Sequence, residues 1–289
     1  MLRTASARRV ERVRTMRPRR YLMCRPTHFT VSYSINPWMD PSAPTSAATG
    51  LAQWKRLHDM LVALGHTVDL IPPCPGLPDM VFAANGAVVV DGRALVARFR
   101  HPQRTAESTA YTQWFRERGW TEVRQARRFN EGEGDFLLAG GVLLAGSGFR
   151  SEPAAWAEAE EFLARPVLGL TLVDPRFYHL DTALAALDDD EIMYYPGAFS
   201  AESRQLLADR FPDAIQATEQ DALAFGLNAL SDGRHVVLAR AAERLAGQLR
   251  ERGFEPVGVE LTELLKAGGG VKCCTLELRT AQAAPRPVE

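Results

Sequence analysis

Four short turn signals, each flanked by apolar residues, recur along this sequence at intervals of 49, 49 and 43 residues. An Asp-Gly or Gly-Gly pair between two apolar runs is a strong indication of a β-hairpin. The turns are Asp91-Gly92, Gly140-Gly141, the acidic run 188–190 and Asp232-Gly233. A period of roughly 40–50 residues indicates a chain built from repeated modules.

Each hairpin is followed by a helical pattern and then by a short apolar strand. The expected helices cover residues 51–64, 106–118, 152–165, 201–210 and 241–252, and the expected strands cover 68–71, 122–125, 167–173, 214–217 and 256–261. A fifth hairpin requires residues 271–279 to pair with residues 21–25 from the other end of the chain. Closure into a ring leaves no exposed sheet edge at the ends of the chain. We therefore predict a five-bladed α/β propeller of ββαβ modules. The alternative is an open α/β sheet with coincidental spacing.

Composition and charge indicate a globular protein without a global field for nucleic acid or membrane. The 289 residues are 46% hydrophobic and 24% charged, with a formal net charge of −1. The four cysteines have no framework spacing, which predicts a reduced, cytoplasmic protein.

We expect one catalytic domain at 21–280 and a disordered tail at 281–289. Residues 1–20 contain eight arginines, and we expect a disordered basic extension there, with a nucleic-acid arm or a transit peptide as alternatives.

Polar residues stand just before each hairpin. Since equivalent positions in a ring of modules point toward the same end of its channel, these residues should meet in one cleft. They are Asp79 and Asn85, Glu131 and Asp135, His179 and Asp181, Asn228, and Cys273.

Cys273 and His179 are the candidate nucleophile and proton carrier. Cys273 follows a run of three glycines, which permits close approach of the backbone to a ligand. We expect Cys273 and Cys274 to face opposite sides of a strand. His179 has an acid two residues later, on the same face of the expected strand. A buried structural cysteine and a metal site are the competing interpretations, but no His-x-x-x-His or Cys-x-x-Cys spacing supports a metal.

The segment 131–135 places three acids within five residues, directly before an apolar strand. A solvated acidic turn is the ordinary interpretation. Because the strand enters the core at that point, some of these carboxylates must be paired, since burial of a lone charge is costly. A cationic substrate would supply such a partner.

These motifs together resemble the guanidine-modifying enzymes of the pentein superfamily, over nearly the whole chain from residue 21 to residue 279. The segments that carry the resemblance are 77–82, 131–135, 179–182 and 273–275. Segments 25–29 and 35–39 resemble the dimethylargininase and arginine dihydrolase branch. The resemblance implies the propeller fold and chemistry on a guanidinium carbon, with no cofactor and no metal.

The resemblance also implies roles for individual residues. Cys273 would be the nucleophile, with Cys274 not involved in catalysis, and His179 the general acid and base. Glu131 would hold the guanidinium and orient His179, although Glu133 competes for that role. Asp79 and Asp181 would bind the guanidinium nitrogens. Apart from the resemblance, Asn85, Asn36 and Asp135 are further candidates for substrate binding. Arg98 and Arg104 are candidates for binding the substrate carboxylate, with an exposed surface charge as the alternative for each. Asn85 stands where many dimethylargininases have an acid, and in this respect resembles the arginine dihydrolases.

The sequence therefore predicts a hydrolase that converts dimethylarginine to citrulline and dimethylamine through a covalent cysteine intermediate. Arginine dihydrolase or deiminase chemistry, amidino transfer to an amine, and a binding ring without catalysis are the alternatives. The expected partner is a small arginine-like molecule. A homodimer is compatible with the sequence.

Overall fold

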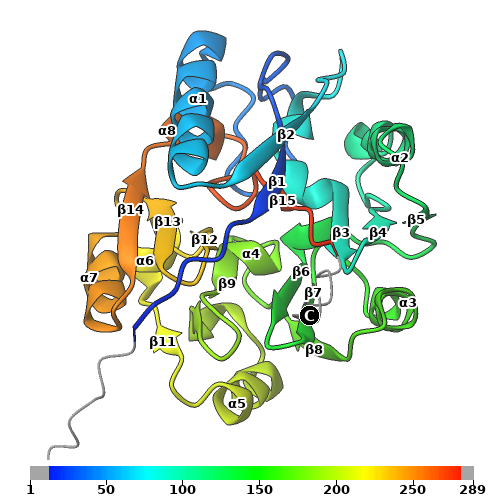
Figure 1. The fold of residues 1–289 in the computed structure, drawn as a ribbon. Helices are drawn as coiled ribbons and strands as arrows, with labels where there is room; N and C mark the ends of the chain where they lie inside the picture. The colour runs from blue at the N-terminus through cyan, green and yellow to red at the C-terminus, as the bar shows by residue number, and fades with distance from the viewer. Residues whose placement is uncertain (1–12, 281–289) are drawn as a thin grey trace, which may run out of the picture.

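Five small mixed sheets surround a central axis in the structure, a computed structural model that describes residues 13–280 (Figure 1). Each sheet pairs two antiparallel strands with a third, parallel strand. The sheets are β15-β1-β2, β3-β4-β5, β6-β7-β8, β9-β10-β11 and β12-β13-β14. The strands are β1 Arg20–Cys24, β2 Thr67–Ile71, β3 Ala87–Val90, β4 Arg93–Val96, β5 Glu122–Gln125, β6 Phe136–Ala139, β7 Val142–Ser147, β8 Val167–Thr171, β9 Leu184–Ala186, β10 Ile192–Tyr194, β11 Ile215–Gln216, β12 Leu230–Ser231, β13 His235–Ala239, β14 Glu255–Val259 and β15 Leu276–Glu277.

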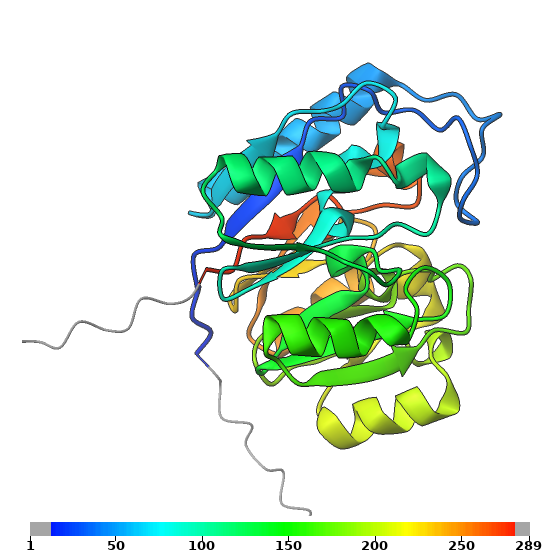
Figure 2. The same cartoon turned by 90° about the vertical axis from the view of Figure 1, so that its right-hand side faces the viewer.

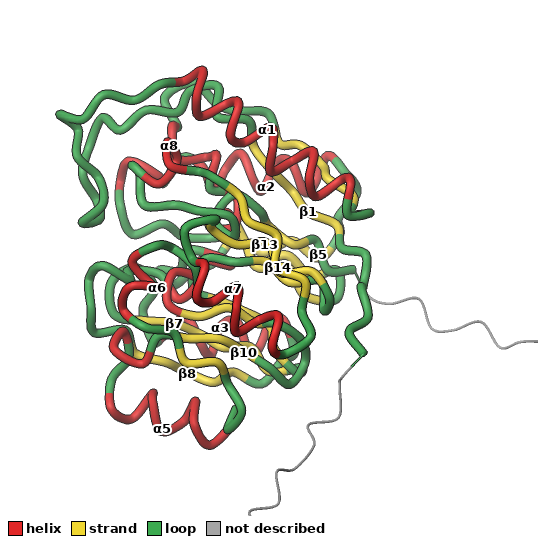
Figure 3. Tube along the Cα trace, turned by 90° about the vertical axis from the view of Figure 1, so that its left-hand side faces the viewer, coloured by secondary structure: helices red, strands yellow, loops and turns green. Residues whose placement is uncertain are grey.

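Five longer helices lie on the outside of the ring, one before the parallel strand of each sheet (Figures 1 and 3). They are α1 Ala47–Ala63, α2 Glu107–Glu117, α3 Ala154–Leu163, α5 Ala201–Arg210 and α7 Glu243–Glu251. The short helices are α4 Leu180–Ala183, α6 Glu219–Leu223 and α8 Thr262–Leu265, with 3-10 turns η1 Pro78–Val81, η2 Ala83–Gly86, η3 Pro102–Arg104, η4 Gly132–Gly134 and η5 Pro196–Ala198. Within residues 13–280, no helix has the length and apolar character needed to cross a membrane.

The ring closes through the two ends of the chain. β15 runs antiparallel to β1, with Tyr21 opposite Glu277 and Leu22 opposite Leu276. The predicted five-bladed propeller is thus confirmed, and the positions of all five outer helices agree with the prediction to within a few residues.

Successive side chains of a strand fill different compartments of the core, because they point to opposite faces of the sheet. In β3, Val89 packs in the cluster that contains Tyr111 and Phe115 of α2. Its neighbour Val88 packs in the cluster that contains Ala159 and Leu163 of α3. The strand is buried on both faces, which explains its unbroken apolar sequence.

The two ends of the ring differ. Loop 25–46 lies at one end, and the described chain begins and ends at the other (Figures 2 and 3). Asp79, before the β3–β4 hairpin, faces loop 25–46, since Tyr33 of that loop donates a hydrogen bond to it. The hairpin turns face the opposite end, where Arg17 pairs with Asp189.

Part of the basic N-terminal segment, from residue 13 onward, makes defined contacts, although disorder was expected up to residue 20. Residues 1–12 of the expected extension, and the expected tail 281–289, lie outside the described residues. From residue 13 onward the segment packs across the hairpin turns. Arg14 inserts between two blades, with Nη1 2.6 Å from Asp188 Oδ2, Nη2 2.6 Å from Glu191 Oε2, and its guanidinium carbon 3.6 Å from the centroid of the Phe254 ring. Within the segment expected to be disordered, Arg14 therefore has specific partners in the structure.

Replacement of Arg14 by alanine should therefore lower the free energy of unfolding by about 1–3 kcal/mol, since it removes a nearly buried cation that bonds to two carboxylates. Arg17→Ala is the control, because the Arg17–Asp189 pair is exposed and should contribute no more than about 1 kcal/mol. Urea unfolding of the three proteins measures both effects. Equal stability of the Arg14 and Arg17 variants would contradict this role of Arg14.

Candidate active site

The structure brings the residues before the five hairpins together at one end of the channel. Asp79 lies in η1 and Asn85 in η2, Glu131 precedes η4, His179 precedes α4, and Cys273 lies in the turn before β15. Each of these side chains is at least 98% buried. The repeated position before each hairpin, read from the sequence, therefore predicts which residues meet at this candidate site.

Cys273 does not lie on a strand as expected. Residues 271–274 form turns, and β15 begins only at Leu276, so strand alternation does not separate Cys273 from Cys274. Likewise, His179 caps a short helix instead of extending a strand. The backbone N–H groups of Cys274 and Thr275 bond within the segment, to Gly270 O at 3.3 Å and Lys272 O at 3.0 Å, so the turn replaces a strand ladder before β15.

Two neighbours hold the thiol of Cys273. Asn228 Nδ2 donates to the sulfur at 3.0 Å, and the thiol donates to Asp181 Oδ2 at 3.2 Å. Asn228 Oδ1 also accepts the backbone N–H of Cys273 at 3.1 Å. Burial and the Asp181 carboxylate raise the pKa of Cys273 well above its ordinary value. In the free protein the sulfur is therefore a thiol, and a cation is needed to favour the thiolate.

His179 is oriented by Glu131. His179 Nε2 lies 2.8 Å from Glu131 Oε2. Since an ionised carboxylate only accepts hydrogen bonds, Nε2 carries a hydrogen, and Nδ1 has no hydrogen-bond partner within the described chain. Burial raises the pKa of Glu131, but Arg150 and His179 outweigh burial and hold this pKa below its usual range.

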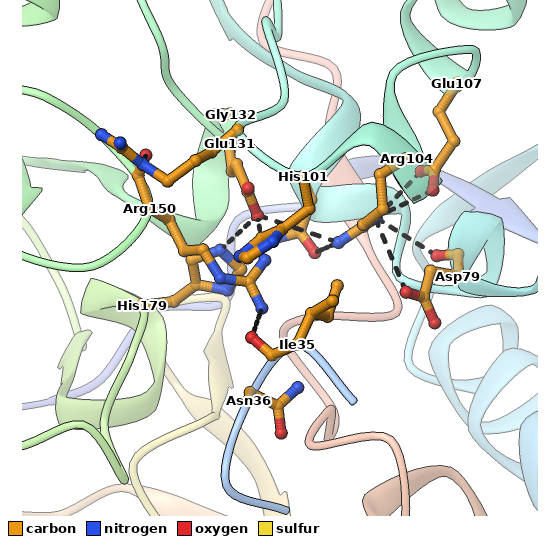
Figure 4. Close-up of polar contacts among 12 residues, drawn as sticks. Ile35, Asn36, Asp79, His101, Arg104, Glu107, Glu131, Gly132, Arg150 and His179 are labelled. Carbon is orange, nitrogen blue, oxygen red and sulfur yellow. Dashed lines mark hydrogen bonds and ion pairs between the residues drawn. The ribbon is translucent and has the colours of Figure 1, made fainter. Parts of the chain in front are cut away.

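Figure 4 shows Glu131 at the centre of a buried ion cluster. Arg150 Nη1 lies 2.7 Å from Glu131 Oε2, and Arg104 Nη1 lies 4.0 Å from the same oxygen. Arg104 is itself paired with Glu107, at 2.8 Å from Nε to Oε1, and donates to Asn85 Oδ1 at 2.8 Å. The cluster thus joins Asn85 to Glu131 through one guanidinium.

Glu131 and Glu133 have different partners in the structure. Glu133 faces away from His179 and binds Lys272 Nζ at 2.7 Å, Arg279, and the backbone N–H of Glu277 at 2.9 Å. All of these partners belong to the last segment of the described chain. Glu133 is therefore a structural carboxylate, and Glu131 is the one that contacts the imidazole.

Other candidates lie outside this cluster. Asp135 accepts hydrogen bonds from the Ser151 hydroxyl at 2.6 Å and from the backbone N–H of Leu180 at 3.1 Å, so it fixes the loop that carries His179. Asn36 binds Ala267 O and the N–H of Trp38, and thereby ties loop 25–46 to the glycine turn. Arg98, expected to bind substrate, is exposed and donates to the carbonyl of Arg127.

Sequence reasoning did not find Arg150 and gave Asn228 no role. Arg150 follows β7, outside the positions before hairpins, and no local motif marks it. Its Nη2 donates to Ile35 O at 3.0 Å, so only the folded ring reveals its place. Asn228 was named among the polar residues before the hairpins, but its position alone did not indicate that it contacts the Cys273 thiol.

Five buried polar atoms of this cluster have no hydrogen-bond partner within the described chain. They are Asp79 Oδ1, Asn85 Nδ2, Glu131 Oε1, His179 Nδ1 and Asp181 Oδ1. Buried polar atoms are nearly always bonded in folded proteins. Three carboxylate oxygens and one basic nitrogen are therefore arranged to accept hydrogen bonds from a ligand that carries several N–H groups and a positive charge.

The comparisons agree with this geometry. Residues 31–280 match the family described as N,N dimethylarginine dimethylhydrolase, eukaryotic. A Mycobacterium tuberculosis protein named N(G),N(G)-dimethylarginine dimethylaminohydrolase is 56% identical over 265 residues, covering 92% of this chain and 87% of the relative. The bifunctional arginine dihydrolase/ornithine cyclodeaminase ArgZ of Synechocystis is 40% identical, but this chain spans only 37% of that longer protein.

Solved structures give the same result for the fold. The N-terminal domain of ArgZ, a mutant bound to substrate, superposes with a TM-score of 0.87 at 38% identity, covering 91% of this chain and 98% of the domain. A dimethylarginine dimethylaminohydrolase adduct gives a TM-score of 0.74 at 18% identity, covering 91% of this chain and the whole of that chain, and supports the fold alone. The protein is a pentein-fold hydrolase of the guanidine-modifying class. More narrowly, it belongs to the dimethylarginine dimethylaminohydrolase family.

Gly134 is required for the active-site geometry. A Cβ at this position would overlap Asn85 Nδ2 and stand 3.2 Å from His179 Cγ and Nδ1. We expect Gly134→Ala to lower kcat by at least about 100-fold, because it displaces the base. Gly247→Ala, on α7 with no atom within 4 Å of the added carbon, should retain full activity. Turnover assays and circular dichroism of both variants test this, and a fully active Gly134→Ala would contradict it.

Asp181 should also affect the pH dependence of stability. Burial raises its pKa to about 7 in the folded protein, so the folded state holds this proton more tightly than the unfolded chain does. The stability from this proton is complete below about pH 4 and is lost as the pH rises to about 7. Relative to Asp181→Asn, the wild type should lose on the order of a few kcal/mol of unfolding free energy across that window. Denaturant unfolding of both proteins at several pH values measures this. A difference in unfolding free energy between them that does not change with pH would contradict the prediction.

Proposed function

We propose that this protein hydrolyses N(ω),N(ω)-dimethyl-L-arginine to citrulline and dimethylamine through a covalent adduct on Cys273. The observation that carries the proposal is the set of unpartnered acceptor atoms of Asp79, Glu131 and Asp181, next to a thiol and a free imidazole nitrogen. A guanidinium is planar and cationic and carries N–H donors, so it matches that set. The relative at 56% identity carries this activity in its name.

The first half of the reaction forms the adduct. The bound cation stabilises the thiolate of Cys273, and His179 Nδ1 accepts the thiol proton. The sulfur adds to the guanidinium carbon, which gives a tetrahedral intermediate. His179 returns the proton to the dimethylamine nitrogen, the C–N bond breaks, and an S-alkylthiouronium remains on the enzyme.

The second half of the reaction releases the product. His179 Nδ1, now neutral, takes a proton from a water molecule that attacks the thiouronium carbon. The C–S bond breaks, the added hydroxyl loses its proton to solvent, and the ureido group of citrulline forms. His179 passes the proton that it took from water to the Cys273 thiolate, and the enzyme returns to its starting state. Glu131 stabilises the imidazolium in both halves because its carboxylate bonds to Nε2.

The amino-acid end of the substrate needs cationic partners for its carboxylate. We assign this role to Arg104 and Arg150 in place of Arg98, because both lie in the buried cluster and Arg98 is exposed. In the free protein their charges are compensated by Glu107 and Glu131. Because these groups are buried beneath loop 25–46, entry of the substrate requires that loop to move.

Arginine dihydrolase activity is the second candidate, and one observation favours it. The Oδ1 atom of Asn85 is held by Arg104, so the amide presents its Nδ2 donor toward Gly134 and His179. A donor at this position can bind a ureido oxygen, whereas a carboxylate cannot. Relatives that are 39–40% identical are named arginine dihydrolases.

The cellular setting forms part of the proposal. All four cysteines are free, which fits a reducing cytoplasm. The partner is a small arginine-like molecule and not nucleic acid. A homodimer is open, and light scattering measures it.

Product analysis separates the candidate functions. The protein is incubated separately with dimethylarginine and with arginine, and the products are identified by mass spectrometry. We expect citrulline and dimethylamine from the first, and loss of at least about 1000-fold in Cys273→Ser, because a hydroxyl is a poor nucleophile here. Cys274→Ser is the matched control and should remain active. Ornithine and ammonia from arginine would instead establish a dihydrolase, and no turnover of either compound would refute the proposal.

A further inference from the structure

His101 is a half-exposed histidine at the outer edge of an otherwise buried cluster. Figure 4 shows its imidazole beside Glu131, Arg104 and Arg150. The charged groups that act on the ring are Arg150, Glu131, Arg100 and Arg104. The mechanism given above does not use this residue.

The backbone around His101 is fixed on both sides. His101 caps η3, and its carbonyl accepts the N–H of Arg104 at 3.1 Å. On the other side, Arg100 Nε donates to the backbone carbonyl of Arg150 at 2.8 Å. The backbone that carries His101 is therefore tied to the segments that carry Arg104 and Arg150.

Burial and the neighbouring Arg150 lower the pKa of His101, and Glu131 opposes this only in part. The ring is neutral at neutral pH and offers one N–H donor and one acceptor. A neutral donor can bind an anion beside two arginines without adding a further like charge to the cluster.

We infer that His101 is a specificity-determining residue that donates a hydrogen bond to the α-carboxylate of the amino-acid substrate. The inference rests on the proposed function. The reacting carbon must lie at Cys273, where Asp181 and Asn228 hold the sulfur. The carboxylate must lie toward the arginines, and His101, which is only partly buried, lies beside the same two arginines. His101 would therefore affect binding of the α-carboxylate end of the substrate and not the chemical step.

The test uses two ligands that differ only in the carboxylate. L-Arginine and its decarboxylated analogue agmatine are titrated calorimetrically into the Cys273→Ser protein, which cannot turn them over. With His101→Ala added, the Kd for arginine should rise about tenfold and the Kd for agmatine should stay within about twofold. His101→Gln retains an N–H donor and should restore part of the affinity. His58→Ala, on α1, is the control and should change neither Kd.

Each contrary outcome has a separate meaning. Equal weakening of both ligands would show that His101 does not recognise the carboxylate, and an unchanged Kd for arginine would remove it from the site; either result overturns the inference. In the enzyme with Cys273 intact, His101→Ala should raise KM for the turned-over substrate with kcat within about twofold, and a fall in kcat alone would also overturn it. Failure of Cys273→Ser to bind arginine and dimethylarginine at all would instead refute the proposed function, and this inference with it.

Discussion

The carboxylate of Glu133 joins the two halves of the active site. It accepts hydrogen bonds from Lys272, Arg279 and the backbone of Glu277, although it lies in the same short turn as Glu131. One carboxylate thus fixes the segment before Cys273, while its neighbour orients the imidazole of His179. Burial raises the pKa of Glu133, but Arg279 and Lys272 outweigh burial and keep it ionised. Removal of these partners would leave a buried charge, which folded proteins do not tolerate.

Burial has opposite outcomes for the ionisation of neighbouring acidic groups, depending on whether a cation lies beside them. Glu131, with Arg150 and His179 beside it, is a stable anion, whereas burial raises the pKa of Asp181 to about 7 and that of Cys273 well above its ordinary value. Two acidic groups are therefore poised to ionise when a cation arrives. The site is polarised toward a positively charged ligand before the ligand binds, and this ligand can generate the nucleophile.

The sequence predicts the fold and the principal site residues because both depend on the repeat. Turn signals such as Asp91-Gly92 define the modules, and the position before each hairpin locates Asp79, Glu131, His179 and Cys273. Arg150 escapes this reasoning, since its contact with Glu131 depends on how two blades pack. The turn at Cys273 and the order around Arg14 escape it too. The first depends on the glycines beside a short β15, and the second on carboxylates from a distant hairpin.

The central claim, that the guanidinium generates the nucleophile, is tested most directly by measuring the ionisation of Cys273. Thiolate absorbance near 240 nm is followed against pH in the His179→Gly protein, with and without saturating dimethylarginine, and the Cys273→Ser, His179→Gly double variant gives the baseline. We predict a thiol that stays protonated beyond its ordinary pKa in the free protein, and a thiolate at neutral pH when the cation is bound. A thiolate present at neutral pH without ligand, or a thiol that stays protonated with ligand bound, would contradict the account.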